Sequence, residues 1–226
     1  MNYQRIILLS LLLLLTGSAV HAQSSAKQCR TNKNSPAASS WHWPAGTRVK
    51  VFLIQGMFTP SEQQAIREVM EQWNVLSEQV GTGIKYDYAG EVGQHENGEG
   101  YLTMTRIEIM KGTNNKYYAY FFPTRATDGS IRSAQITFDF KTTDVKALKS
   151  LVAHELGHGM GLWDCKSCKG RSTIMNGFPG VNNDNGLVAP SACDMQVVKT
   201  LFEQARGLAQ IAHEQIHNPQ QTKLRQ

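Results

Sequence analysis

The stretch HELGHGMGLWD, residues 154–164, decides how the rest of the chain is interpreted. It places His154 and His158 four residues apart, with Glu155 beside the first histidine. Residues four apart lie one above the other on a helix, so both imidazoles can point at one zinc ion. Glu155 projects from nearly the same face, where it can take a proton from a zinc-activated water and pass it to a leaving amine. The same spacing also arises by chance on solvent-facing helices, so the residues that follow must decide.

Those residues supply a third ligand. A helix that continued past His158 would carry Asp164 away from the metal, so the chain has to turn. Gly159 and Gly161 allow the turn because glycine adopts positive φ at little cost. Asp164 then offers a carboxylate oxygen, and three protein ligands leave the fourth zinc position for water, as a catalytic site requires. We therefore predict one catalytic zinc ion bound by His154, His158 and Asp164.

The elements around this motif follow from hydrophobic periodicity. Apolar residues recur at helical spacing before His154, and Thr142 or Thr143 can cap that helix. A second helix starts at Pro60 behind a capping Thr59, and a third runs from about Ala192 to Ile211. Strand-like alternation or β-branched and aromatic composition marks five segments, at residues 49–53, 84–88, 101–110, 117–122 and 133–140.

HELGHGMGLWD resembles the metzincin signature H-E-x-x-H-x-x-G-x-x-H, with Asp164 in place of the final histidine. The form that ends in aspartate is similar to the snapalysin group of small secreted bacterial metzincin proteases. In RSTIMNG, Met175 stands eleven residues after Asp164, where the family has its Met-turn beneath the metal-binding histidines. Without the neighbouring motif, Met175 would be read as ordinary core packing. The order of elements between residues 41 and 206 is also similar.

This resemblance implies an α+β, metzincin or zincin-like fold. Its parts would be a twisted mixed sheet of about five strands, a zinc helix preceded by an edge-like strand SAQITFDF, and a C-terminal helix. The implied function is a secreted zinc endopeptidase that acts on proteins or peptides. The chain divides into a signal peptide (1–22), a flexible N-terminal arm (23–40), a catalytic domain (41–211) and a C-terminal tail (212–226). A non-catalytic exported protein that binds metal or protein on this scaffold is the alternative.

The N-terminus has the form of a secretory leader. Arg5 precedes an apolar run, and small residues lead to Ala22, where we expect cleavage. The run is shorter than the roughly 20 residues that span a bilayer, which disfavours the alternative of a retained anchor. We expect a secreted or periplasmic protein with no membrane association after cleavage. Loss of Arg5 lowers the formal net charge from +5 to +4, and the remaining basic residues are dispersed among acids. Nucleic-acid binding is therefore not expected.

Export favours disulfides among the four cysteines, Cys29, Cys165, Cys168 and Cys193. Three connectivities are open, and we expect Cys165 and Cys168 to be oxidised with each other or with Cys193. Rival interpretations of CKSC are a structural zinc site or a redox motif, which lack further ligands at suitable spacing and a thioredoxin-like context. Cys29 could instead cap the zinc as a thiolate or stay free.

The chain departs from the family pattern in three ways. Asp164 rules out a three-histidine site, Gly177 stands where some metzincins have a tyrosine, and no latency prodomain is recognisable. A second HExxH, HEQIH at 213–217, has Asn218 and Pro219 directly after it and no third ligand. The stretch NNDNG offers oxygen ligands, but nothing else supports a calcium site. Peptide specificity and oligomeric state stay open.

Overall fold

The computed structural model describes residues 29, 36–109, 119–168, 172–176 and 187–217, with only the backbone given for the last residues of that final range. The expected leader, the NNDNG stretch and Gly177 lie outside these ranges. In the described part, no helix has the length and apolarity needed to cross a membrane.

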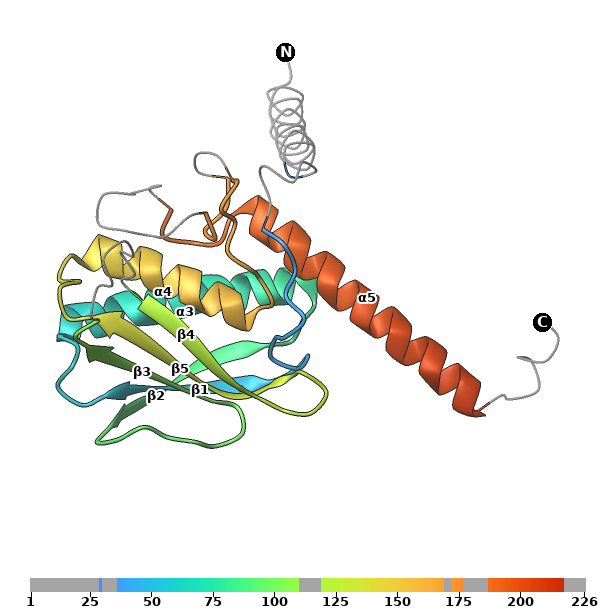
Figure 1. The fold of residues 1–226 in the computed structure, drawn as a ribbon, viewed down its shortest axis with the longest axis horizontal. Helices are drawn as coiled ribbons and strands as arrows, with labels where there is room; N and C mark the ends of the chain where they lie inside the picture. The colour runs from blue at the N-terminus through green and yellow to red at the C-terminus, as the bar shows by residue number, and fades with distance from the viewer. Residues whose placement is uncertain (1–28, 30–35, 110–118, 169–171, 177–186, 218–226) are drawn as a thin grey trace, which may run out of the picture.

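A mixed five-stranded sheet forms the base of the molecule (Figure 1). The spatial order is β2-β1-β3-β5-β4, and every neighbouring pair is parallel except β4 and β5. The strands are β1 (Arg48–Ile54), β2 (Lys85–Val92), β3 (Tyr101–Ile107), β4 (Ala119–Arg125) and β5 (Ile131–Asp139). The expectation of an α+β protein with a mixed sheet of about five strands is confirmed.

The expected edge strand is wrong. SAQITFDF forms β5, which lies between β3 and β4. Its register with β3 runs from Tyr101–Ser133 to Ile107–Asp139, so it is paired along nearly its whole length. Its other edge pairs with β4, which is antiparallel to it and is the last strand in the sheet order.

Helices α3 (Pro60–Val80) and α4 (Val145–Gly159) lie together on one face of the sheet (Figure 1). Helix α5 (Ala192–His217) contacts α3 and runs outward, so its C-terminal half projects beyond the sheet (Figure 1). The expected end near Ile211 is therefore too early, and the backbone of HEQIH continues α5. The helix stops at His217, directly before Asn218 and Pro219.

Local sequence explains where the two core helices begin. At α3, Thr59 caps as expected: its side chain accepts from the Glu62 N–H, and Glu62 accepts from the Thr59 N–H at 2.8 Å. At α4 the cap is Asp144 and not Thr142 or Thr143, because the Asp144 carboxylate accepts the Ala147 N–H at 2.7 Å.

The core between sheet and helices fixes the position of α4. Apolar side chains of β1, α3 and α4 form one buried cluster. Trp73 on α3 donates its indole N–H to the Ala153 carbonyl at 3.0 Å, and Tyr86 on β2 donates its hydroxyl to the Leu156 carbonyl at 3.0 Å. Two buried donors from different elements thus attach to the turns of α4 that carry the histidines.

The segment expected as a flexible arm is attached to the fold at two places. Ala38 and Leu162 form an antiparallel bridge, flanked by the hydrogen bonds Ser39 N–H to Gly161 O (2.7 Å) and Trp163 N–H to Ala37 O (2.9 Å). Cys29 forms a disulfide with Cys193 at the start of α5. Residues 37–39 are therefore part of the described fold, because their backbone pairs with the segment that leads to Asp164.

Candidate metal centre

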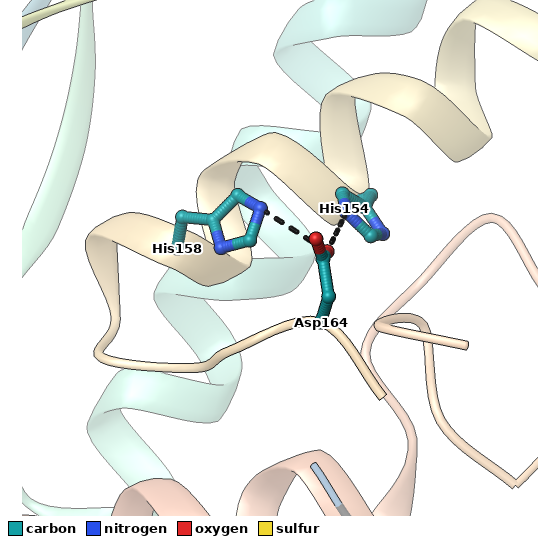
Figure 2. Close-up of side chains that lie close together, drawn as sticks. All are labelled: His154, His158 and Asp164. Carbon is teal, nitrogen blue, oxygen red and sulfur yellow. Dashed lines mark hydrogen bonds and ion pairs between the residues drawn. The ribbon is translucent and has the colours of Figure 1, made fainter. Parts of the chain in front are cut away.

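The last turns of α4 and the segment after it bring together His154, His158 and Asp164 (Figure 2). Asp164 Oδ1 lies 3.0 Å from His154 Nε2 and 3.6 Å from His158 Nε2. One ligand atom from each of these residues lies within 4.8 Å of the other two. In the part of the chain that the structure describes, this is the one group of three such side chains that could hold a metal ion.

Backbone carbonyls orient both imidazoles. His154 Nδ1 lies 3.1 Å from the Ile174 carbonyl, and His158 Nδ1 lies 2.8 Å from the Leu162 carbonyl. A carbonyl oxygen only accepts, so each Nδ1 carries the proton and donates. In the neutral ring, Nε2 then keeps its lone pair, and it faces Asp164. Histidine ligands at metal sites are commonly held by such hydrogen bonds from their other ring nitrogen, so the residues present fit a divalent cation such as zinc.

The turn that returns Asp164 depends on Gly161. This residue has φ of +87°, and its N–H donates to the His158 carbonyl at 3.0 Å. The Leu162 N–H reaches back to the Gly157 carbonyl at 3.1 Å, which ends the helix in a left-handed cap.

Gly159 serves a different purpose from the one predicted. It is the last residue of α4 and has no positive φ. A Cβ there would lie 2.7 Å from the Trp43 indole nitrogen and 2.8 Å from the Tyr86 hydroxyl. Gly159 is therefore required because two large side chains approach the helix, and Gly161 alone supplies the left-handed backbone.

Met175 packs directly against the histidine helix. It is fully buried, and a Cβ on Gly157 would lie 2.6 Å from its sulfur. The turn that carries it is closed by the Asn176 N–H donating to the Thr173 carbonyl at 3.3 Å. The absence of a side chain at Gly157 thus leaves room for a methionine between the turns that bear His154 and His158.

Asp194 anchors this turn and was not predicted as a site residue. Its buried carboxylate accepts hydrogen bonds from the Thr173 hydroxyl, from the Ile174 N–H at 3.0 Å and from the Ser191 N–H at 2.7 Å. The Ile174 carbonyl is the group that orients His154. Asp194, at the start of α5, therefore positions this candidate ligand through its hydrogen bond to Ile174. An aspartate at a helix start is ordinarily read as a cap, and nothing in its own stretch signals the contact with residues 173 and 174.

The three candidate ligands have shifted pKa values. Burial alone would lower the pKa of His154, but the hydrogen bond to Asp164 and the charges of Glu155 and Asp164 outweigh it and raise that pKa. Burial, together with the charge of His154, lowers the pKa of His158 to about 4. Burial opposes ionisation of Asp164, yet both histidines hold its pKa below the ordinary range. A carboxylate beside two imidazoles is the charge arrangement that a cation site needs, and the raised pKa of His154 means that a proton competes with a cation for this ring.

Glu155 is buried beside these residues, with 4% of its surface exposed. Burial, with a smaller contribution from Asp164, raises its pKa to about 7 although the charge of His154 acts in the opposite direction. A group that gains and loses a proton near neutral pH suits general acid–base chemistry. A bound dication would lower this pKa, so the carboxylate form would then prevail.

The cysteines pair as Cys165–Cys168 and Cys29–Cys193. The prediction that Cys165 and Cys168 are oxidised is confirmed, and they are joined to each other. This short bridge directly follows Asp164, and the Cys165 N–H donates to the Met175 carbonyl at 2.8 Å. The segments that carry Asp164 and Met175 are thereby held side by side. All four cysteines are in disulfides, so Cys29 has no thiolate for a metal.

Comparison with known proteins gives little further identification. No protein-family model matches the chain, and no curated protein matches it. Among solved structures, the structure of myroilysin matches with a TM-score of 0.42 and 16% identity, covering 70% of this chain and 81% of that chain. A likeness this distant assigns neither a family nor an activity, so any functional conclusion depends on the residues of the site.

Proposed function

We propose that the protein is an exported zinc-dependent endopeptidase with a metzincin-like fold and an aspartate as third metal ligand, as in the snapalysin-like type. The observation that carries this proposal is the convergence of one ligand atom each from His154, His158 and Asp164 within 4.8 Å, beside the buried Glu155. Three protein ligands form an open coordination shell, which is typical of catalytic zinc.

Each residue of the site has a distinct task in hydrolysis. A zinc ion bound here supplies Lewis-acid polarisation of the attacking water and of the scissile carbonyl. His154, His158 and Asp164 would hold the ion, and the hydrogen bonds to the carbonyls of Ile174 and Leu162 would keep both Nε2 atoms available to it. Glu155 takes the proton of the attacking water and delivers it to the leaving amine.

The arrangement of β4 supports a peptide as the substrate. β4 is the last strand in the sheet order and contacts α4, the helix of both histidines. An extended peptide can add to a terminal strand through backbone hydrogen bonds, which bind any sequence. A peptide bond held in this way would lie along the side of the sheet nearest the metal centre.

Export is supported by the two disulfides, because disulfides persist in oxidising compartments. We expect the secreted form to begin at Gln23, after cleavage behind Ala22. N-terminal sequencing of protein recovered outside the cell tests this, and an intact leader would contradict it.

The activity is tested by hydrolysis of casein or gelatin, with and without a chelator, alongside zinc content by elemental analysis. We expect about one zinc ion per chain, hydrolysis that chelation abolishes, and recovery on addition of zinc. Stoichiometric zinc without hydrolysis of either protein would favour the non-catalytic alternative. Absence of bound metal in protein purified without chelator would exclude both.

A further inference from the structure

The two stretches of chain on either side of Asp164 are held in different ways. The stretch before it, residues 159–163, is joined to the segment before β1 by backbone hydrogen bonds. These run from Trp43 N–H to Gly159 O (3.0 Å), from Ser39 N–H to Gly161 O (2.7 Å) and from Trp163 N–H to Ala37 O (2.9 Å). The approach to Asp164 is therefore fixed by backbone pairing.

The stretch after Asp164 is closed by a covalent bond. Residues 165–168 form a short turn whose ends are joined by the Cys165–Cys168 disulfide, and the Cys168 N–H lies 3.4 Å from the Cys165 carbonyl oxygen. The Cys165 N–H also donates to the Met175 carbonyl at 2.8 Å. Because Cys165 directly follows Asp164, the disulfide begins one residue from a candidate metal ligand. The state of this bond therefore affects how firmly Asp164 is held from its C-terminal side.

This turn lies at the surface of the molecule. Lys166 and Ser167 are exposed, whereas Cys165 is 5% and Cys168 is 8% exposed. Local opening of a surface turn uncovers such sulfur atoms without unfolding the rest of a protein. After reduction both thiols stay within the same short turn, so the bond can re-form locally. The cysteines of the other bridge are 164 residues apart and depend on the whole fold to meet again.

We propose that the Cys165–Cys168 bond is a redox-sensitive site, at which a dithiol reductant reversibly lowers the metal affinity of the centre. This proposal rests on the metal-binding part of the proposed function. A thiolate of the reductant attacks Sγ of Cys168, which forms a mixed disulfide and releases Cys165 as a thiolate. The second thiol of the reductant then displaces Cys168. Two electrons and two protons pass to the protein, and the reductant leaves as a cyclic disulfide.

Opening of the bond leaves Asp164 firmly held on one side only. Its carboxylate then spends less time facing His154 and His158, so a cation that binds must first order it. Removal of a group that supports a metal ligand commonly lowers metal affinity by roughly 10- to 100-fold, and we expect a loss in this range. The closed, tightly binding form is the one that persists in an oxidising compartment. The turn is a target of the reductant and not itself a redox catalyst.

The proposal is tested by measuring zinc affinity before and after treatment of the metal-free protein with dithiothreitol. The dithiothreitol is removed by gel filtration without air, because its thiols also bind zinc, and zinc affinity is then measured by competition with a chromophoric chelator. Alkylation and mass mapping of each sample identify which bridge is open, and circular dichroism reports whether the fold is intact. We expect opening of the Cys165–Cys168 bond to lower zinc affinity by roughly 10- to 100-fold and reoxidation to restore it.

The double variant Cys165→Ser with Cys168→Ser is the matched control, because it keeps the other bridge and has no thiol in the turn. We expect it to bind zinc as weakly as the reduced parent and to lose much less affinity when treated with dithiothreitol. A loss as large as that of the parent would assign the effect to the Cys29–Cys193 bridge and overturn the proposal. Unchanged or tighter zinc binding by a parent whose Cys165 and Cys168 are mapped as open would also overturn it. So would a bond that stays closed in excess dithiothreitol while the protein is folded.

Casein hydrolysis by the zinc-saturated samples separates this proposal from the proposed function. If no sample hydrolyses casein but zinc affinity follows the state of the Cys165–Cys168 bond, the peptidase function fails and the redox-sensitive site remains. If the oxidised and reduced proteins hydrolyse casein and bind zinc alike, the redox-sensitive site is wrong and the peptidase function stands.

Discussion

At the scale of single residues, Glu155 and Asp164 belong to one motif but have different duties. In the proposed mechanism Glu155 transfers a proton and makes no metal bond, so Glu155→Ala is expected to retain zinc and to lose about 10²- to 10⁴-fold in activity. Asp164→Ala is expected to lower zinc occupancy as well, because two histidines fall short of the usual three protein ligands. Zinc content and turnover of each variant, measured beside the parent, separate the two roles.

The second HExxH provides the control for this series. His213→Ala and His217→Ala together should change neither zinc content nor turnover, because HEQIH has no third ligand in its own stretch. The side chains of these two residues lie outside the described part of the structure. Loss of zinc in this double variant, together with an active Glu155→Ala variant, would show that the wrong motif has been assigned.

Gly157 offers a second prediction at this scale. Alanine is ordinarily preferred to glycine inside a helix by roughly 0.5–1 kcal/mol. Here the added Cβ would lie 2.6 Å from the Met175 sulfur and 3.2 Å from the Trp73 ring, both fully buried. Overpacking a buried contact costs about 1–3 kcal/mol, so Gly157→Ala should destabilise the protein and reduce zinc affinity. Urea unfolding and zinc titration measure the two effects.

Two further variants make that prediction specific. Gly207 on α5 has nothing within 4 Å of an added Cβ, so Gly207→Ala should leave zinc affinity unchanged and raise stability slightly. In a Met175→Ala background, Gly157→Ala should lower the free energy of unfolding by less, because the two positions are in contact. Equal costs in both backgrounds would contradict the packing of Met175 beneath the helix.

At the scale of elements, a buried ion pair joins the start of α3 to β3. Arg106 lies 2.8 Å from Glu62, and both side chains are about nine-tenths buried or more. Burial would raise the pKa of Glu62, but the hydrogen bonds from Arg106 and from the Thr59 N–H outweigh it, so the pKa is below the ordinary 4.5. A lowered folded-state pKa adds stability that is fully present above about pH 4.5. This stability is lost as the pH falls from there through the lower folded-state pKa of Glu62.

Arg106→Met should therefore lower the free energy of unfolding by an amount that depends on pH. At pH 7 it leaves a buried carboxylate without its partner, which costs about 3–5 kcal/mol. Without Arg106, burial should dominate and raise the pKa of Glu62. Protonation of Glu62 in acid should then make the free energies of unfolding of parent and variant more alike as the pH falls to about 4. Urea unfolding at several pH values tests this. Lys149→Met, which removes the more exposed ion pair with Glu68, is the control. An equally large loss of stability in this control would contradict the special role of the buried pair.

The sequence predicts where helices and strands lie along the chain better than it predicts which strands are neighbours in the sheet. Period-2 and period-3.6 patterns are local, so β1, α3 and α4 could be located from Val49, Ile66 or Leu148 and their repeats. Strand order depends on pairing across long stretches of chain, and β5 was consequently placed at the edge. The proximity of His154, His158 and Asp164 could be predicted because all three lie within one stretch of eleven residues. The contributions of Asp194 and Tyr86 could not be predicted, because each lies more than 20 residues from the three candidate ligands in the sequence.

At the scale of the whole molecule, the two disulfides differ in the length of chain they close. Cys29 and Cys193 are 164 residues apart, whereas Cys165 and Cys168 are three apart. Loop-closure entropy predicts a loss of about 5 kcal/mol when the long bridge is removed and about 2 kcal/mol for the short one. Double serine variants of each pair, compared by urea unfolding, test this order.

The short bridge should instead act locally. Because it follows Asp164 directly, replacing Cys165 and Cys168 with serine should weaken zinc binding more than the Cys29 and Cys193 replacement does. Zinc titration of both double variants measures this. A larger loss of stability from the short bridge, or a larger loss of zinc affinity from the long one, would contradict the assigned roles.

The anchoring of the Thr173 turn by Asp194 has a consequence for the order in which a new chain becomes competent. Synthesis delivers the N-terminal part first, so both histidines of α4 emerge well before Asp194. The turn beneath those histidines gains its carboxylate partner only when the start of α5 arrives, and Cys193 reaches Cys29 at the same stage. A nascent chain would thus carry all three ligands and Glu155 without the support that fixes them. In the exported peptidase that we propose, activity would therefore be the last property to appear, after the chain has left the compartment of its synthesis.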